Sequence, residues 1–343
     1  MRKLLNTLYV TTPDAYLSRD GENVVLQVNG EERFRVPVHN LEGIVCFNYM
    51  GASPALLGLC CDRGVPICFV TQSGRFLARV SGRVTGNVLL RKRQYRLADS
   101  PEHACSLASS FVAGKILNSR SVLLRFARDH REKPGASVVA EAANRLLSFS
   151  DRLSGCHGLD ALRGLEGDAA REYLSVFDHL ITTAEPAFRF RGRTRRPPLD
   201  AVNALLSFFY SILSYECASA LETVGLDPQV GFLHRDRPGR LSLALDLMEE
   251  LRPYLVDRFV LTLINTGQVN ARGFLTKESG AVLMDESTRK SVLTEWQKRK
   301  QEQITHPFLE EKIKVGLIPY TQALLLARHL RGDLDEYPPF LMR

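Results

Sequence analysis

The chain has 343 residues, enough for roughly two domains of ordinary size. Hydrophobic residues make up 45% and charged residues 24%, which excludes a disordered, collagen-like or multi-span membrane protein. The net charge is +7 and arginine outnumbers lysine by 35 to 10. This excess suits a polyanionic partner because guanidinium binds phosphate bidentately, although codon usage in a GC-rich genome gives the same bias.

Residues 1–82 predict a small β-rich domain. Short alternating segments such as NVVLQVNG have strand composition, and Asn29-Gly30 is a hairpin turn signal. One helix interrupts the strands, because Ser53 can cap it, Pro54 suits its first turn and Gly64 ends it.

The pattern changes after a basic linker, which we place at residues 83–100. Helical periodicity then dominates and we find no strand pattern. The expected helices are 101–131, 136–154, 166–184, 198–224, 241–255 and 316–331. We therefore predict an α+β protein, in which the N-terminal β-domain precedes a larger, all-α-helical catalytic domain (101–343) with a C-terminal tail.

The cysteines and the apolar segments indicate a reducing compartment. None of the seven cysteines forms a C-x-x-C pair, and Cys60 and Cys61 lie in an apolar stretch. The N-terminal residues lack the sustained apolar run of a signal peptide. The longest apolar stretch, 202–221, contains polar residues, so we predict a buried helix and no membrane span. We expect a cytoplasmic protein.

Basic side chains gather in clusters that suit phosphate contact. Residues 1–96 hold 13 basic and 7 acidic side chains, whereas the rest of the chain is nearly neutral. A solvated surface explains such runs equally well. Two clusters lie at residues 91–96 and 189–196, and a third lies on a probable helix at 289–300. The candidate nucleic-acid-binding residues are Arg91, Lys92, Arg93, Arg189, Arg191, Arg193, Arg195, Arg196, Arg237 and Arg240.

Acidic side chains in apolar surroundings are candidates for a cation site, because phosphodiester chemistry uses a divalent cation held by hard ligands. Glu166 lies between glycines, which permit close backbone approach, but it also suits an ordinary helix start. His234 ends an apolar triplet before several arginines and is either a ligand or a surface histidine. Asp246 and Glu249 share one face of an apolar helix, where Arg252 offers a salt bridge.

Together these segments strongly resemble the CRISPR-associated integrase and endonuclease family Cas1, the universal adaptation nuclease. The resemblance is carried by GLEGDAAREYL at 164–174, GFLHRDRPGRLSLALDLMEELRP at 231–253 and RTRRPPLDAVNALLSFFYSIL at 193–213. The opening NTLYVTTPDAYLSRDGENVVL also resembles the family's first hairpins, and together with the YPPFL tail it is typical of the subtype I-C branch.

The resemblance implies that Glu166, His234 and Glu249 are the catalytic residues and hold Mg²⁺ or Mn²⁺, with Asp246 as a weaker metal ligand. It implies insertion of short DNA into the CRISPR repeat array by attack of a 3′-hydroxyl, and nicking of branched DNA by water. It also implies several partners: the prespacer duplex, the leader–repeat DNA, a second copy that forms a homodimer, and the small protein Cas2.

Three features stay open at this stage. Tyr173 either packs in the core or stacks on a base, and Arg171 either contacts phosphate or pairs with Asp168. The tail at 332–343 is either mobile or docks on Cas2. Two other functions fit the same basic clusters: a DNA-bending module without catalysis, and a stand-alone repair nuclease that acts on branched DNA.

Overall fold

The computed structural model describes residues 5–47, 51–72, 74–82, 88–156 and 158–342, and the chain forms two compact units. The first unit comprises Met1–Thr85 together with Met284–Glu302. The second comprises Gly86–Leu283 together with Gln303–Arg343, and it holds every candidate catalytic residue.

The division differs from the sequence prediction at helix α9 (Glu286–Gln301), which we assigned to the helical domain. This helix belongs to the N-terminal unit because its side chains bond to that unit's strands. Gln297 donates a hydrogen bond to the carbonyl of Thr7 at 2.6 Å, and Lys300 pairs with Glu42 at 3.0 Å. Two residues of the third basic cluster, Arg289 and Lys300, are therefore buried.

The N-terminal unit contains two small sheets. In the first sheet β1 and β5 are parallel, β5 and β6 are parallel, and β6 and β7 are antiparallel. The second is an antiparallel meander of β2, β3 and β4. The strands are β1 (Asn6–Val10), β2 (Ala15–Asp20), β3 (Asn23–Val28), β4 (Glu31–Pro37), β5 (Leu41–Cys46), β6 (Ile67–Val70) and β7 (Phe76–Val80).

Local signals in this unit act as the sequence predicts. Asn29 and Gly30 both take positive φ and connect β3 to β4. The Ser53 hydroxyl accepts a hydrogen bond from the Leu56 amide and caps α1 (Pro54–Asp62).

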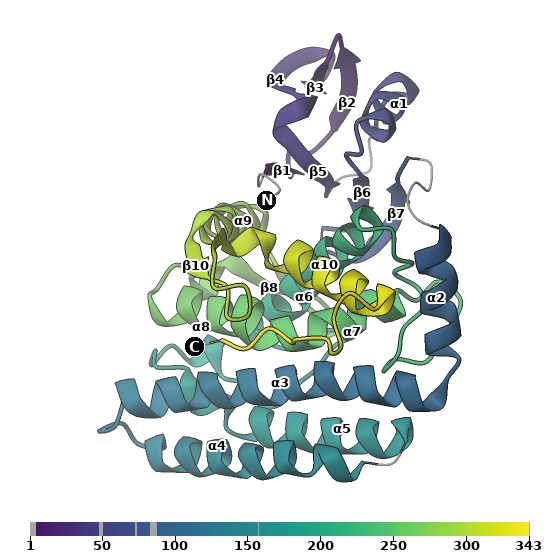
Figure 1. Ribbon diagram of the computed structural model, residues 1–343. Coiled ribbons are helices and arrows are strands. Elements are labelled where there is room, and N and C mark those ends of the chain that lie inside the picture. Colours follow the sequence, from purple (N-terminus) through teal and green to yellow (C-terminus); the bar gives the residue numbers. More distant parts are fainter. Residues whose placement is uncertain (1–4, 48–50, 73, 83–87, 157, 343) are drawn as a thin grey trace. The chain divides into compact units, whose positions relative to one another are not determined.

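The second unit is mainly helical. Figure 1 shows α3, α4 and α5 side by side, and α3 also contacts α7. The helices are α2 (Val88–Ala98), α3 (Pro101–Asp129), α4 (Ala136–Asp151), α5 (Leu159–Ser175), α6 (Ala201–Thr223), α7 (Ser242–Leu251), α8 (Arg258–Asn265) and α10 (Ile318–Arg331). Short 3₁₀ turns occur at Val38–Asn40, Leu153–Gly155, Phe177–Leu180, Pro186–Phe188, Ala271–Gly273 and Val315–Leu317.

Two expectations for this part of the chain were wrong. The basic linker contains helix α2, while its residues 83–87 lie outside the described residues. The helical domain also contains strands: β8 (Phe274–Thr276) pairs with β9 (Val282–Met284), and β10 (Gln303–Thr305) pairs with β11 (Lys312–Lys314). Each has three residues, too few for a period-two pattern to be recognised.

Helix α6 is the central apolar helix. Within the described residues it is the one helix long and apolar enough to cross a membrane by length and composition, and 61% of its apolar window is buried inside the protein. It contacts α7 and α10, which accounts for its composition.

A π-helical turn over Arg252–Asp257 joins α7 to α8. Proline has no amide hydrogen, and its ring would clash with the carbonyl four residues earlier in a regular helix. Pro253 therefore favours a wider turn directly after Leu251, the last residue of α7. This turn determines where Arg252 points.

Candidate active site

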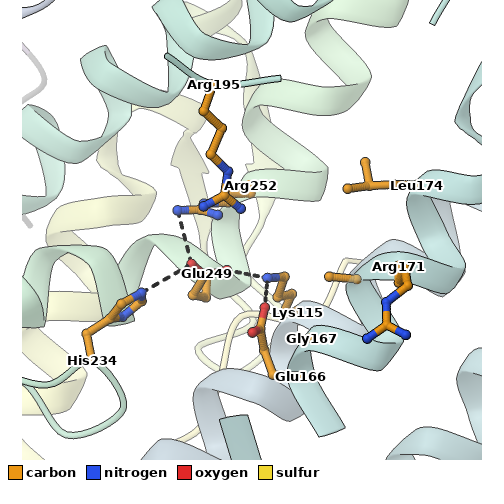
Figure 2. A pocket seen from close by; sticks show the side chains of 10 residues that line it. Lys115, Glu166, Gly167, Arg171, Leu174, Arg195, His234, Glu249 and Arg252 are labelled. Carbon is orange, nitrogen blue, oxygen red and sulfur yellow. Dashed lines mark hydrogen bonds and ion pairs between the residues drawn. The ribbon is translucent and has the colours of Figure 1, made fainter. Parts of the chain in front are cut away.

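Three helices, two loops and the π-helical turn bring charged side chains to a single pocket of about 320 Å³. Figure 2 shows Lys115 from α3, Glu166 from α5 and Glu249 from α7 around its centre, with His234 to one side. The predicted catalytic residues Glu166, His234 and Glu249, which are far apart in sequence, therefore meet in one place.

Glu249 is the most buried acid of this pocket, with 4% of its side chain exposed. Its carboxylate lies 3.0 Å from Arg252, 2.6 Å from the Lys115 ammonium and 4.0 Å from Nε2 of His234. Burial opposes ionisation, but the charges of Arg252 and Lys115 outweigh it and lower the pKa of Glu249 to about 2. Glu249 is therefore a carboxylate at neutral pH.

Glu166 lies in the middle of its helix. We considered a helix-start carboxylate as the alternative reading, and it is wrong because α5 begins seven residues earlier, at Leu159. The flanking Gly164 and Gly167 are not required for packing, since an added Cβ at either position would meet no atom within 4 Å. Glu166 pairs with Lys115, so the partner of its carboxylate is a buried ammonium and not the start of a helix.

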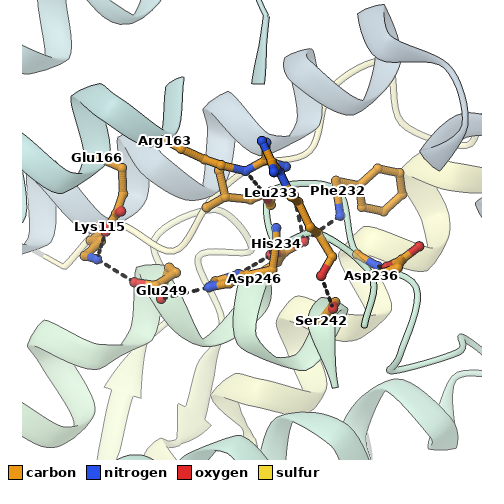
Figure 3. A network of polar contacts seen from close by, with 12 residues as sticks. Lys115, Arg163, Glu166, Phe232, Leu233, His234, Asp236, Ser242, Asp246 and Glu249 are labelled. Carbon is orange, nitrogen blue, oxygen red and sulfur yellow. Dashed lines mark hydrogen bonds and ion pairs between the residues drawn. The ribbon is translucent and has the colours of Figure 1, made fainter. Parts of the chain in front are cut away.

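Asp246 orients the histidine, as Figure 3 shows. Its side chain is fully buried, and its Oδ2 accepts the amides of Phe232 and Leu233 at 2.6 and 2.9 Å. Its Oδ1 accepts the His234 amide at 2.9 Å and His234 Nδ1 at 2.6 Å. All four contacts are made with the loop, so the structure gives Asp246 a positioning role, and its role as a weaker metal ligand stays a prediction.

The loop at residues 230–241, here called the histidine loop, has two further contacts that were not predicted from the sequence. Nε of Arg163, on α5, donates to the carbonyl of Leu233 at 2.7 Å. Gly231 permits close approach, since a Cβ there would lie 2.8 Å from Asp246 Oδ2 and from Ser242 Cβ. The sequence motif does not indicate which helix holds the loop.

Lys115 is the main residue of the site that the sequence analysis missed. Its ammonium contacts both Glu166 and Glu249, and 15% of its side chain is exposed. It lies on α3, far in sequence from the motifs. The one available signal was a lysine among apolar residues, FVAGKIL, in a chain where basic residues are mostly arginine.

The arginine-rich segment 189–196 has two faces. Phe188 and Phe190 alternate with the arginines and point inward, where Phe190 packs on Phe177 and Phe188 on Phe274. The alternation leaves the intervening side chains exposed to solvent. The exposed arginines are Arg189, Arg191, Arg195 and Arg196, and of these Arg195 lines the pocket.

Arg193 differs from its neighbours and from our expectation of a phosphate contact. Its guanidinium donates to the carbonyl of Thr194, to Asn203 Oδ1 at 2.7 Å and to Ser207 Oγ at 2.9 Å. It also lies over the Tyr210 ring, 5.3 Å from the centroid. These contacts fasten the arginine-rich segment to α6, so Arg193 has a structural role.

The other predicted nucleic-acid contacts are spread around the second unit. Lys92 and Arg93 on α2 are exposed and Arg91 is half-buried, while Arg237 is exposed and Arg240 half-buried in the histidine loop. None of the five lines the pocket. Arg171 does line it, and pairs with Asp168 at 2.8 Å.

The family profile described as "CRISPR associated protein Cas1" matches residues 8–298. The chain belongs to the Cas1 family. Relatives of this Cas1 chain include "CRISPR-associated endonuclease Cas1 1" of Chlorobaculum tepidum, 52% identical over the full length of both chains. "CRISPR-associated endonuclease Cas1 2" of Rhodospirillum rubrum is 51% identical, again over both full lengths. The subtype I-C branch stays a prediction, because these names carry no subtype.

Solved structures share the fold of this Cas1 chain. A Cas1 protein from Thermotoga maritima has a TM-score of 0.82 at 24% identity, covering 95% of this chain and 97% of the other. A casposase bound to its integration product has a TM-score of 0.85 at 20% identity, covering 99% and 95%. At these identities the likeness establishes the fold alone.

The pocket of this Cas1 chain contains the donor types of a divalent-cation site. Glu166 and Glu249, from different helices, already share one cation, the ammonium of Lys115. His234 presents Nε2 toward Glu249 because Nδ1 is engaged by Asp246. Within the described residues, no three His, Cys, Asp or Glu side chains are grouped closely enough to hold a metal ion. Two carboxylates and an imidazole are nevertheless the ligand chemistry of Mg²⁺ or Mn²⁺ sites.

Packing bears on two open questions, although docking of the tail on Cas2 stays a prediction. Tyr173 is buried against Phe177, with ring centroids 5.7 Å apart, so it belongs to the core. The C-terminal tail docks on its own unit: the Phe340 amide donates to Glu250 Oε2 at 3.0 Å, and the Asn118 amide donates to the Phe340 carbonyl at 2.7 Å.

Proposed function

We propose that this Cas1 chain is a metal-dependent DNA integrase and endonuclease of CRISPR adaptation. It inserts short DNA into the repeat array of the prokaryotic cell by transesterification, and it nicks branched DNA when water replaces the 3′-hydroxyl. One observation carries the proposal: Glu166 and Glu249 share a cation position, and His234 faces Glu249, in a pocket that is also lined by arginines. The names of its relatives, which are endonucleases, support the same reading.

Some side chains of the pocket would bind the cation, and others would bind phosphate. Glu166, His234 and Glu249 would hold Mg²⁺ or Mn²⁺, which polarises a phosphodiester and lowers the pKa of the attacking hydroxyl. Asp246 keeps the Nδ1 proton of His234 and leaves Nε2 as an acceptor. Arg195 and Arg171 lie at the pocket wall, where they can bind and orient the phosphates of a DNA strand.

The proposed partners follow from the same family. We propose a homodimer formed through the N-terminal units and a heterocomplex with Cas2, both acting on a prespacer duplex and the leader–repeat DNA. A solved structure titled "Cas6-RT-Cas1--Cas2 complex" has a chain with the fold of this one, at a TM-score of 0.84 and 21% identity, covering 100% of this chain and 37% of that chain.

The test is integration of a short duplex into a supercoiled plasmid that carries a leader and repeats, with Cas2 and Mg²⁺ or Mn²⁺ present. We expect Glu166→Gln to lower joining and nicking by about 100-fold or more while binding of the duplex is retained. The matched control is Glu141→Gln, an exposed acid on α4, which should join at the rate of the natural chain.

The rival functions give different results in this assay. A DNA-bending module would bind and bend the plasmid equally in the natural chain and in Glu166→Gln, with no joining in either. A stand-alone repair nuclease would nick branched DNA but never join the duplex, whether or not Cas2 is added.

A further inference from the structure

Lys115 occupies the position that the proposed metal would take. Its Nζ lies 2.6 Å from Glu249 Oε2 and even closer to Glu166 Oε1. Mg²⁺ binds carboxylate oxygens at about 2.0–2.1 Å, so an ion shared by these two oxygens would overlap the ammonium. The two cations therefore cannot occupy the site together.

A second possible metal position, between Glu249 and His234, is next to the Arg252 guanidinium. Glu249 Oε1 faces His234 Nε2 at 4.0 Å, but the same oxygen lies 3.0 Å from the Arg252 guanidinium. A metal placed there would leave Lys115 undisturbed and would not use Glu166. A metal shared by Glu166 and Glu249 would displace Lys115, whereas a metal between Glu249 and His234 would not.

The charge balance favours exchange. In the pocket Lys115 and Arg252 are matched by Glu166 and Glu249, so the two carboxylates are already neutralised. A lysine ammonium is a compact charge on a flexible stem, and it can leave a site without disturbing its helix. The open part of the pocket gives it room beside Arg195 and Arg171.

We propose that Lys115 is a built-in cation that fills the metal position in the metal-free protein and is displaced when the divalent ion binds. Metal binding is then an exchange of one cation for another, and the apparent affinity is lowered by the competing lysine. The displaced ammonium is left at the pocket wall, available to a DNA phosphate. This inference rests on the proposed function, because it requires Glu166 and Glu249 to be metal ligands.

The experiment measures Mn²⁺ binding to the purified full chain by electron paramagnetic resonance of the free ion. For Lys115→Met we expect the Kd for Mn²⁺ to fall by about tenfold, the factor for a metal-ready state populated about 10% of the time in the natural chain. Lys133→Met, an exposed lysine between α3 and α4, is the matched control and should leave the Kd unchanged. An unchanged or higher Kd in Lys115→Met overturns the proposal, because removal of a competing cation must tighten metal binding.

A second measurement covers the case in which Lys115→Met does not fold without metal. Thermal unfolding is then followed in EDTA and in saturating Mn²⁺. Folding that returns with Mn²⁺ supports replacement of the ammonium by the ion, and a variant that stays unfolded contradicts it. Glu166→Gln separates the two proposals: if it binds Mn²⁺ as tightly as the natural chain, the ligand set of the proposed function fails, whatever Lys115→Met does.

Discussion

Oδ1 of Asp246 accepts a hydrogen bond from Nδ1 of His234 at 2.6 Å, and the backbone amide of the same histidine donates to the same oxygen at 2.9 Å. The side chain and the main chain of His234 are thus held by a single atom. The imidazole can rotate little about its side-chain bonds, and its acceptor nitrogen stays directed at Glu249.

Replacing Asp246 by asparagine should therefore impair catalysis. An amide at this position presents a nitrogen donor to backbone amides that are themselves donors. We expect the joining and nicking rates to fall about 10- to 100-fold, measured in single turnover. Asp236→Asn is the control in the same loop, since this exposed side chain accepts only one hydrogen bond, from Gly231 at 3.3 Å. Equal rates for both variants would contradict the positioning role.

Arg193 and Arg195 should respond differently to alanine substitution. Arg195→Ala removes an exposed charge at the pocket, so the slope of log affinity for duplex DNA against log salt should shrink by about 1. Arg193→Ala removes one of the two donors to Asn203 Oδ1 and the donor to Ser207 Oγ, and should lower the free energy of unfolding by about 1–3 kcal/mol. Fluorescence anisotropy at several salt concentrations and urea unfolding measure the two effects. A full salt-slope change in Arg193→Ala would show that it contacts phosphate after all.

Glycines 114 and 167 flank the two partners of the central ion pair and form a second matched pair. A Cβ at Gly114 would lie 2.7 Å from Glu250 Cβ and 3.1 Å from Pro339 Cβ. Gly114→Ala should thus push α3 away from α7 and destabilise the fold by about 1–3 kcal/mol. Gly167→Ala meets nothing within 4 Å and should stabilise α5 by up to about 1 kcal/mol. Thermal unfolding distinguishes them, and two equal shifts would be evidence against the close helix contact.

Glu250 makes the stability of the fold depend on pH. Burial raises its pKa to about 8, although Tyr337 and Gln322 donate hydrogen bonds to it. In the unfolded chain its value is 4.5. As the pH rises from 4.5 to about 8, the unfolded chain loses this proton while the folded chain keeps it, so stability falls. Above about pH 8 both states are ionised and this contribution stays constant.

Glu250→Gln should flatten that dependence, because the variant has no proton to lose at this position. The measurement is the midpoint of thermal unfolding at about pH 5.5 and about pH 8.5. The exposed Glu311→Gln, in the same unit, should keep the full difference of the natural chain. An undiminished difference in Glu250→Gln would place the origin of the pH effect elsewhere.

The sequence predicted the site better than it predicted the connections around it. Glu166, His234 and Glu249 were found because their motifs are local and their residue types are specific to cation chemistry. Lys115 was missed because its partners lie on other helices, and helical periodicity does not identify which turn of α3 faces them. The inward contacts of Arg193 were not predicted because charge runs do not reveal which side chain turns inward. Helix α9 was assigned by composition, whereas its place depends on bonds to β1 and β5.

The π-helical turn at Arg252–Asp257 has a consequence for how this gene can change over time. Arg252 at its start contacts Glu249, and Asp257 at its end accepts the hydroxyl of Tyr210 at 2.5 Å. Deleting one residue between them would rotate α8 by about 100° relative to α7 and separate one of the two contacts. Insertions and deletions should therefore accumulate in the exposed loops of related chains. The number of residues between Arg252 and Asp257 should stay constant, because it keeps both contacts in place.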